Sequence, residues 1–130
     1  MNRFLSSITL TGVLLSVALA SAACSVAAVA GEPSQAPIDP NAVKIVASGQ
    51  AFTTTEATAP AGKAFQLVFD SQTSDPHNIA ISRDGAEPVF RSDVFSGPGT
   101  KTYQVDALTT GTYAFKCDVH PGMTGTLTVK

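Results

Sequence analysis

The chain has 130 residues, a formal net charge of −2 and 44% hydrophobic residues. That length accommodates at most one globular domain. It contains neither a basic stripe nor a block of like charges, which excludes nucleic acid as an expected partner.

Residues 1–23 are typical of an export signal. Arg3 precedes an apolar run that ends in small residues, as in secretory leaders. The run is short and interrupted by Ser and Thr, which disfavours a membrane span. Ala20-Ser21-Ala22 and Ala28-Val29-Ala30 both fit a small-x-small cleavage site. We therefore expect an exported protein, located in the periplasm or at the extracellular face of the membrane.

The residues after the leader leave the manner of attachment open. The stretch SAAC, which ends at Cys24, resembles the lipobox of bacterial lipoproteins, although Ser21 stands where Leu is usual. Lipidation of Cys24 would anchor the chain stably, since more than one acyl chain is attached. Residues 24–40 are rich in Ala, Pro and Ser and lack periodicity, so they predict a tether.

Residues 41–130 form the expected domain. Short alternating segments rich in Val, Ile, Thr, Phe and Tyr are separated there by Gly, Pro, Asp and Ser. This spacing predicts an all-β fold, a β-sandwich of about seven or eight strands. No segment has a clear helical period, although 84–96 is also compatible with a short helical turn. The expected strands are 43–48, 52–58, 64–70, 77–83, 88–95, 101–106, 111–117 and 123–130.

Side-chain alternation places three candidate ligands at the ends of inward-facing rows. Alternate residues of a strand share a face, so His77, Cys117 and Met123 each continue an apolar row. This placement puts the three side chains at one rim of the sandwich core rather than in solvent. The rows are His77-Ile79-Ile81, Tyr113-Phe115-Cys117 and Met123-Gly125-Leu127-Val129.

The loop CDVHPGM, residues 117–123, concentrates three donor side chains. His120 follows Cys117 by three residues and precedes Met123 by three. A turn through Pro121-Gly122 brings such positions together. The only other His of the chain is His77.

Cys117 is expected to need a binding partner. If Cys24 is lipidated or removed with the leader, Cys117 is a lone thiol in an oxidising compartment. A Cys24–Cys117 disulfide is the alternative. Two imidazoles, a thiolate and a thioether are the ligand set of a blue-copper centre, whereas structural zinc sites use Cys, His or carboxylate rather than Met. The donors therefore indicate one copper ion that cycles between Cu(II) and Cu(I).

The stretch PHNIAI, followed at the C-terminus by GTYAFKCDVHPGMTGTLTV, resembles the cupredoxins, the plastocyanin and amicyanin group in particular. The resemblance covers residues 41–130 and implies a Greek-key β-sandwich. It also implies one copper ion held by His77, Cys117, His120 and Met123. The two-residue gap between His120 and Met123 is similar to that of amicyanin.

The resemblance further implies roles for neighbouring residues. The backbone N–H of Asn78 would donate to the Cys117 sulfur, and the Asn78 side chain would tie the two loops together; alternatively Asn78 caps a strand end. Asp118 would accept a backbone N–H inside the ligand loop, or be solvated. The Pro76 carbonyl would lie near the metal, opposite Met123.

The function implied is single-electron transfer by a monomer. His120 would be the electron exit, and Pro121, Gly122 and Pro98 around it would dock redox partner proteins weakly. We expect no enzyme activity, because the site uses both His residues and leaves none for a second type of copper. Nucleophilic catalysis by Cys117 would need an orienting polar partner that the sequence does not indicate. Copper delivery or storage is the alternative function.

Overall fold

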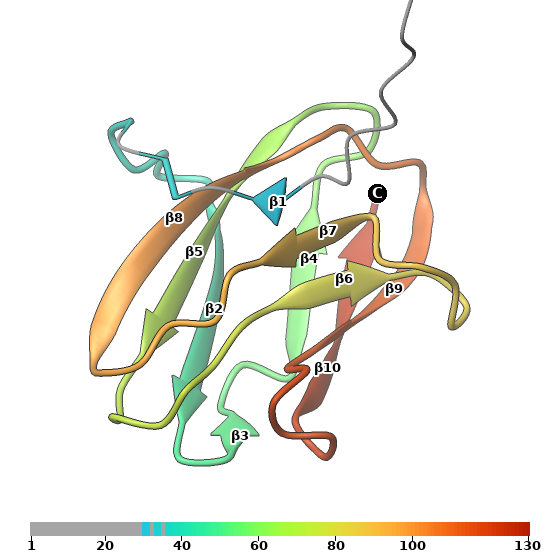
Figure 1. The fold of residues 1–130 in the computed structure, drawn as a ribbon. Helices are drawn as coiled ribbons and strands as arrows, with labels where there is room; N and C mark the ends of the chain where they lie inside the picture. Colours follow the sequence, from blue (N-terminus) through green and yellow to red (C-terminus); the bar gives the residue numbers. More distant parts are fainter. Residues whose placement is uncertain (1–29, 32, 35) are drawn as a thin grey trace, which may run out of the picture.

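The computed structural model describes residues 30, 31, 33, 34 and 36–130, which form two β-sheets packed face to face (Figure 1). These described residues include no helix, and so none that is long and apolar enough to cross a membrane. The predicted all-β sandwich is confirmed. The export signal at 1–23 lies outside the described residues, and so do residues 24–29, 32 and 35 of the predicted tether, Cys24 among them.

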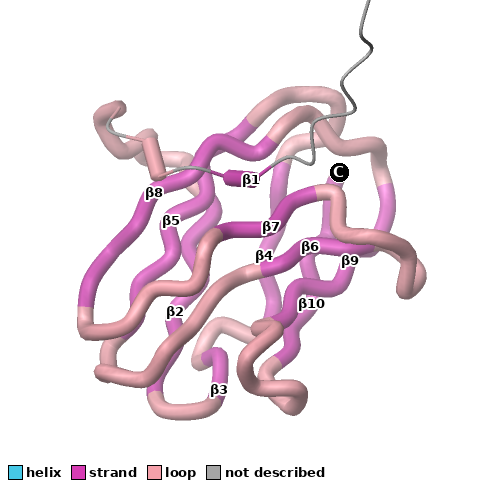
Figure 2. Tube along the Cα trace, in the orientation of Figure 1, coloured by secondary structure: helices cyan, strands magenta, loops and turns pink. Residues whose placement is uncertain are grey.

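The strands that are neighbours in space are mostly distant in the sequence, as in a Greek key (Figure 2). One sheet has, in spatial order, β1 (Ala30–Gly31), β7 (Phe90–Ser92), β6 (Ala80–Ser82), β9 (Gly111–Lys116), β10 (Thr124–Val129) and β4 (Glu56–Ala59). The other has β3 (Ala51–Phe52), β2 (Val43–Ser48), β5 (Phe65–Ser71) and β8 (Gly99–Val105).

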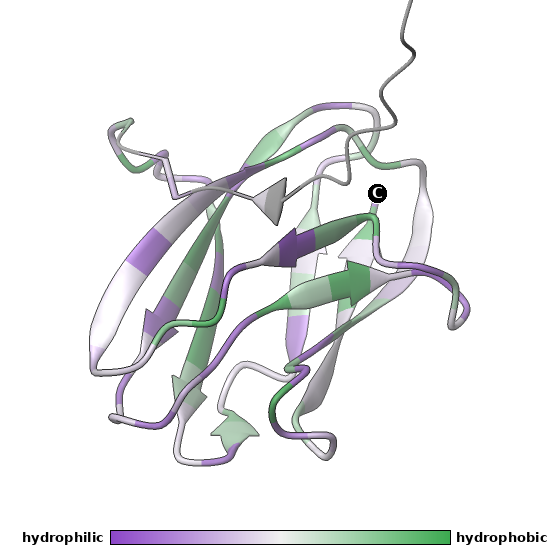
Figure 3. Cartoon of the chain, viewed as in Figure 1, coloured by the Kyte–Doolittle hydropathy of each residue, from purple (hydrophilic) through white to green (hydrophobic). Residues whose placement is uncertain are grey.

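Alternating burial explains why these segments form strands around one core. In β9 every second side chain is buried, and β2 has the same pattern. Figure 3 shows hydrophobic residues along the strands of both sheets. Phe52 contacts Phe69 and Phe115 edge-to-face, with ring centroids 6.2 and 5.1 Å apart, and so connects the two sheets. Burying each such ring contributes about 1.5–3 kcal/mol to stability.

Five of the eight expected strands match observed strands to within two residues at each end, and three differ more. The segment 52–58 splits into β3 and β4, because the N–H groups of Thr53 and Thr54 both donate to the Val46 carbonyl. The segments 77–83 and 88–95 shorten to β6 and β7. The helical turn considered for 84–96 is not among the described elements; a turn with positive φ at Asp84 (52°) and Gly85 (73°) lies there instead.

The described end of the predicted tether lies on the sandwich. β1 pairs in parallel with β7, and Pro33 forms a bridge with Tyr103. The Gln66 side chain accepts a hydrogen bond from Asp39 N–H (2.6 Å) and donates one to the Pro37 carbonyl (2.9 Å). Contacts with the domain therefore begin before the predicted boundary at residue 41.

We predict that Gly125→Ala destabilises the sandwich. A Cβ at Gly125 would lie 2.2 Å from the buried Phe115 ring and 2.8 Å from the Thr55 carbonyl oxygen, and neither can move freely. Such overpacking costs about 1–3 kcal/mol, measured as the free energy of unfolding in urea. Gly99→Ala is the matched control, since a Cβ there meets nothing within 4 Å. Equal stability of the two variants would contradict this packing argument.

Candidate metal centre

His77 is held rigidly inside the sandwich by its own backbone. It lies between β5 and β6 and forms an isolated bridge with Phe95, in which each N–H donates to the other's carbonyl at 2.9 Å. The His77 side chain is fully buried, and neither ring nitrogen has a hydrogen-bond partner. Unpaired buried polar atoms are rare and unfavourable, so these nitrogens fit the role of metal ligands.

The loop 117–123 joins β9 to β10 and is closed by backbone hydrogen bonds. Cys117 N–H donates to the Met123 carbonyl (3.0 Å), and Met123 N–H donates to the His120 carbonyl (2.9 Å). The antiparallel pair Lys116–Thr124 stands directly outside this closure. Cys117 and Met123 are both buried, so the predicted inward-facing rows end where the sequence placed them.

The two segments bring three donors together, as predicted. The ligand atoms of His77, Cys117 and His120 all lie within 4.8 Å of one another. Cys117 Sγ is 3.8 Å from His120 Nδ1, and the ring centroids of the two His are 5.1 Å apart. Cys117 is a free thiol. This arrangement can present a thiolate and two imidazoles to one ion.

The electrostatics of the pocket favour the neutral imidazole that metals require. Burial lowers the pKa of His77 below its usual value, His120 lowers this pKa further, and Asp75 opposes the shift. A neutral ring offers a lone pair for ligation. The donor set of one soft sulfur and two nitrogens fits a copper ion. Met123, buried at the far end of the loop, is the predicted fourth ligand.

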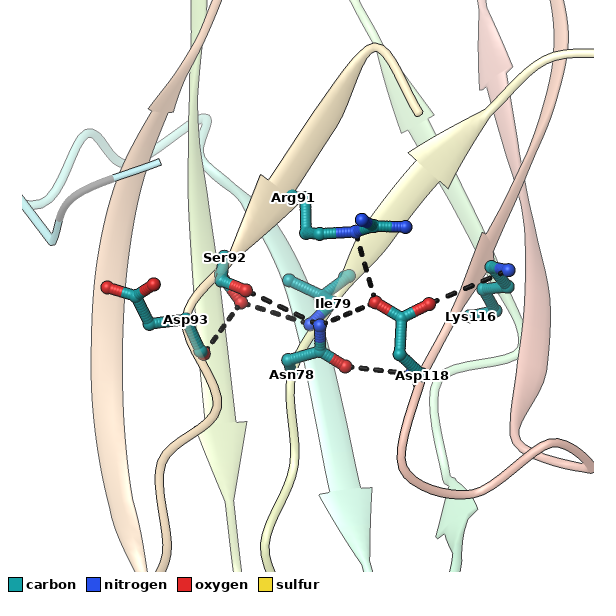
Figure 4. A network of polar contacts seen from close by, with 7 residues as sticks. All are labelled: Asn78, Ile79, Arg91, Ser92, Asp93, Lys116 and Asp118. Atoms are coloured by element: carbon teal, nitrogen blue, oxygen red, sulfur yellow. Dashed lines mark hydrogen bonds and ion pairs between the residues drawn. The ribbon is translucent and has the colours of Figure 1, made fainter. Parts of the chain in front are cut away.

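Asn78 ties the two ligand segments together, as predicted (Figure 4). Its side-chain Nδ2 donates to the Asp118 carboxylate, and its Oδ1 accepts the Asp118 N–H, both at 2.8 Å. Nδ2 also lies 3.4 Å from the Ser92 carbonyl. The other predicted contact, from Asn78 N–H to Cys117 Sγ, is not among the hydrogen bonds of the described residues and stays a prediction.

Asp118 has different partners from those expected. Its carboxylate accepts from Asn78 rather than from a backbone N–H of the ligand loop, and it pairs with Arg91 Nε (3.1 Å) and Lys116 Nζ (3.6 Å). These contacts hold the pKa of Asp118 below its usual value, the Asn78 hydrogen bond most of all, against the opposing effect of partial burial. The sequence prediction missed Arg91 and Lys116, because alternation shows only that they point outward.

The remaining predicted residues lie at the surface. Pro76 directly precedes His77 and is exposed. Pro121 and Gly122 follow His120 on the loop and are exposed, and so is Pro98, which precedes β8. The grouping of Pro98 with the loop, and the approach of the Pro76 carbonyl to the metal, stay predictions.

Comparisons with known proteins agree with this geometry. The family described as cupredoxin-like domain matches residues 14–129. Plastocyanin A/B of Petroselinum crispum is 33% identical over 89 residues, which cover 62% of this chain and 89% of the relative.

Two solved structures share the fold. Dithionite-reduced auracyanin from the photosynthetic bacterium Roseiflexus castenholzii has a TM-score of 0.62 at 22% identity, and the match covers 69% of this chain and 97% of that one. Amicyanin from Paracoccus versutus (Thiobacillus versutus) has a TM-score of 0.55 at 21% identity, with 72% and 85% covered.

We predict that His77→Leu stabilises the metal-free protein while abolishing metal binding. The variant replaces two buried, unpaired nitrogens by apolar atoms, which should raise the free energy of unfolding by about 1 kcal/mol. Asn78→Leu is the contrasting control, because Asn78 is buried with its polar atoms bonded, and it should lower stability. Urea unfolding with a chelator present measures the free energy of unfolding of both variants. If His77→Leu were less stable than the wild type, the His77 ring would not be unpaired, and the prediction would be wrong.

Proposed function

The chain belongs to the cupredoxin-like family, and from that premise we propose that it is a mononuclear blue-copper protein that passes single electrons between redox partner proteins. His77, Cys117 and His120 would hold the ion, with Met123 as a weaker fourth ligand. The observation that carries the proposal is the convergence of the first three donors, together with the unpaired nitrogens of buried His77. When bound, copper would supply the Cu(II)/Cu(I) couple.

The protein's contribution is to hold the donors still. The bridge at His77 and the backbone closure of 117–123 hold both ligand segments through backbone hydrogen bonds. Burial of Cys117 and Met123 limits access of water. A site that is already formed need not rearrange much between oxidation states, which favours rapid electron transfer.

His120 is the proposed route for the electron. It is partly exposed, whereas His77 is completely buried, so His120 is the imidazole that a partner can approach. Val119, 40% exposed, stands beside it on the loop, followed by the exposed Pro121 and Gly122. Together with Pro98, these residues would form a small apolar surface suited to weak, short-lived docking of a redox partner.

We also propose that the chain is exported and held in the periplasm or at the extracellular face of the membrane. The mature protein would either begin at a lipidated Cys24, which anchors it, or begin after a cleavage site without a lipid. The leader-like order of residues 1–23 and the SAAC stretch support this. Mass spectrometry of the mature N-terminus distinguishes the forms: a diacylated Cys24 supports the anchor, whereas an unmodified N-terminus after Ala22 or Ala30 refutes it.

We predict that Cu(II) turns the metal-free protein intensely blue, because a thiolate of Cys117 would bind the ion directly. Cys117→Ser should lose the visible absorption, whereas Cys24→Ser, which removes the other thiol, should keep it. The measurement is an optical titration, with Zn(II) as competitor. The proposal is falsified if the wild type stays colourless and binds Zn(II) in preference to copper.

Electron carriage and copper delivery predict different electrochemistry. A carrier keeps its ion in both oxidation states, so cyclic voltammetry of the loaded protein should give a reversible couple over repeated cycles with no loss of copper. A delivery protein would release the ion on reduction, and copper appearing in the filtrate of the reduced sample would favour that alternative.

A further inference from the structure

We propose that Asp118, Arg91 and Lys116 form an ion-paired clamp that positions the ligand loop against the His77 segment and adjusts the redox potential of the bound ion. The part about the potential rests on the function proposed above, whereas the part about positioning does not. All three residues act through Cys117 and Asn78, and are therefore positioning residues.

The clamp acts at the residue directly after Cys117. Asp118 makes a reciprocal pair of hydrogen bonds with Asn78, the residue directly after His77, at 2.8 Å each. Positions 77 and 117 are thus held together by their immediate neighbours across 40 residues of chain. Whatever fixes Asp118 in place also fixes the distance between two of the proposed ligands.

Two cations fix Asp118 from different strands. Arg91 of β7 and Lys116 of β9 both lie opposite Ala80 of the intervening β6, so they approach the carboxylate from two sides (Figure 4). Arg91 Nε contacts Oδ2 at 3.1 Å, and Lys116 Nζ contacts Oδ1 at 3.6 Å. The ligand loop is therefore joined to β7 and β9 as well as to the His77 segment.

The two ion pairs of Asp118 can hold the ligand loop in place although their side chains are partly exposed. The Asp118 side chain is 30% exposed, and Arg91 and Lys116 cover it with side chains that are 52% and 48% exposed. Isolated surface ion pairs contribute little, but this carboxylate is also fixed by Asn78, which is 2% exposed. The cations therefore act on a group that is already oriented.

The clamp also places an excess of positive charge beside the loop, since two cations flank one carboxylate. Reduction lowers the charge of a copper site by one, so nearby positive charge favours the reduced state. Removing Arg91 or Lys116 should lower the midpoint potential, and removing the charge of Asp118 should raise it. A merely structural role would not produce opposite signs.

The first experiment needs no metal. In a Cys24→Ser background, Cys117 is the sole thiol, and it is 1% exposed, so its reaction with 5,5′-dithiobis(2-nitrobenzoate) reports opening of the loop. Asp118→Asn, which keeps an oxygen for Asn78 but loses the charge, should speed the reaction about two- to fivefold. The double variant Arg91→Gln, Lys116→Gln should speed the reaction to a similar extent. The single variant Arg91→Lys, which keeps the positive charge, should retain most of the protection of Cys117.

Lys44→Gln is the matched control, because Lys44 forms a comparable surface ion pair with Asp70 (3.3 Å) on the four-stranded sheet. It should leave the reaction rate unchanged. Raising the salt concentration should speed the reaction of the wild type and not that of the double variant, since salt screens exposed charges. Equal rates in the wild type and in every clamp variant would overturn the positioning role.

The second experiment measures midpoint potentials of the copper-loaded variants. We expect Asp118→Asn and Arg91→Gln to shift the oxidised-to-reduced ratio in opposite directions by up to about tenfold, equivalent to about 59 mV for one electron. Shifts of the same sign, or no larger than that of Lys44→Gln, would overturn the tuning role. If the wild type bound no copper, the proposed function would be wrong. The thiol experiment would still show whether the clamp positions the ligand loop.

Discussion

Backbone hydrogen bonds at the ends of β9 and β10 hold Cys117, His120 and Met123 at one point of the sandwich. The Cys117 N–H and the Met123 N–H both donate within the loop, so the loop is closed by the same kind of bond that pairs the two strands. Every other property of the site, from the burial of the thiol to the exposure of His120, follows from where this closure places the loop relative to His77.

His77 is the buried polar side chain of the site whose ring nitrogens have no hydrogen-bond partner within the protein. A fully buried imidazole without hydrogen bonds is unfavourable by about 1–3 kcal/mol, and the apolar core must offset that loss. The rest of the pocket is well satisfied, because Asn78 and Asp118 bond each other and the surrounding strands. Among the described residues, the buried side-chain nitrogens without a hydrogen-bond partner are thus those of His77, at the position where an ion would bind, and functional sites commonly break a local rule in this way.

The sequence predicted the fold class because alternation is a local pattern, and it predicted the convergence of His77 with Cys117 and His120 from the loop spacing together with the resemblance to the cupredoxins. Alternation fixed the inward rows, and the spacing of the loop fixed its donors. The partners of Asp118 could not be predicted, because Arg91 and Lys116 approach it only when β6 lies between β7 and β9, and strand order is a non-local property. The split of 52–58 was missed for a related reason: Thr53 and Thr54 suit a strand, but their N–H groups bond to Val46 of a strand earlier in the chain.

If the chain is processed as proposed, the place of β1 ties the cleavage site to the cover of one sheet edge. Ala30 pairs with Arg91 and Gly31 with Ser92, so β1 covers the backbone edge of β7. Processing after Ala30 would leave Gly31 as the first residue and remove one of these two pairs, whereas processing after Ala22 or at Cys24 would retain both. An uncovered strand edge can recruit a strand of another molecule. The choice of peptidase site would then set whether one or two residue pairs cover this edge of β7.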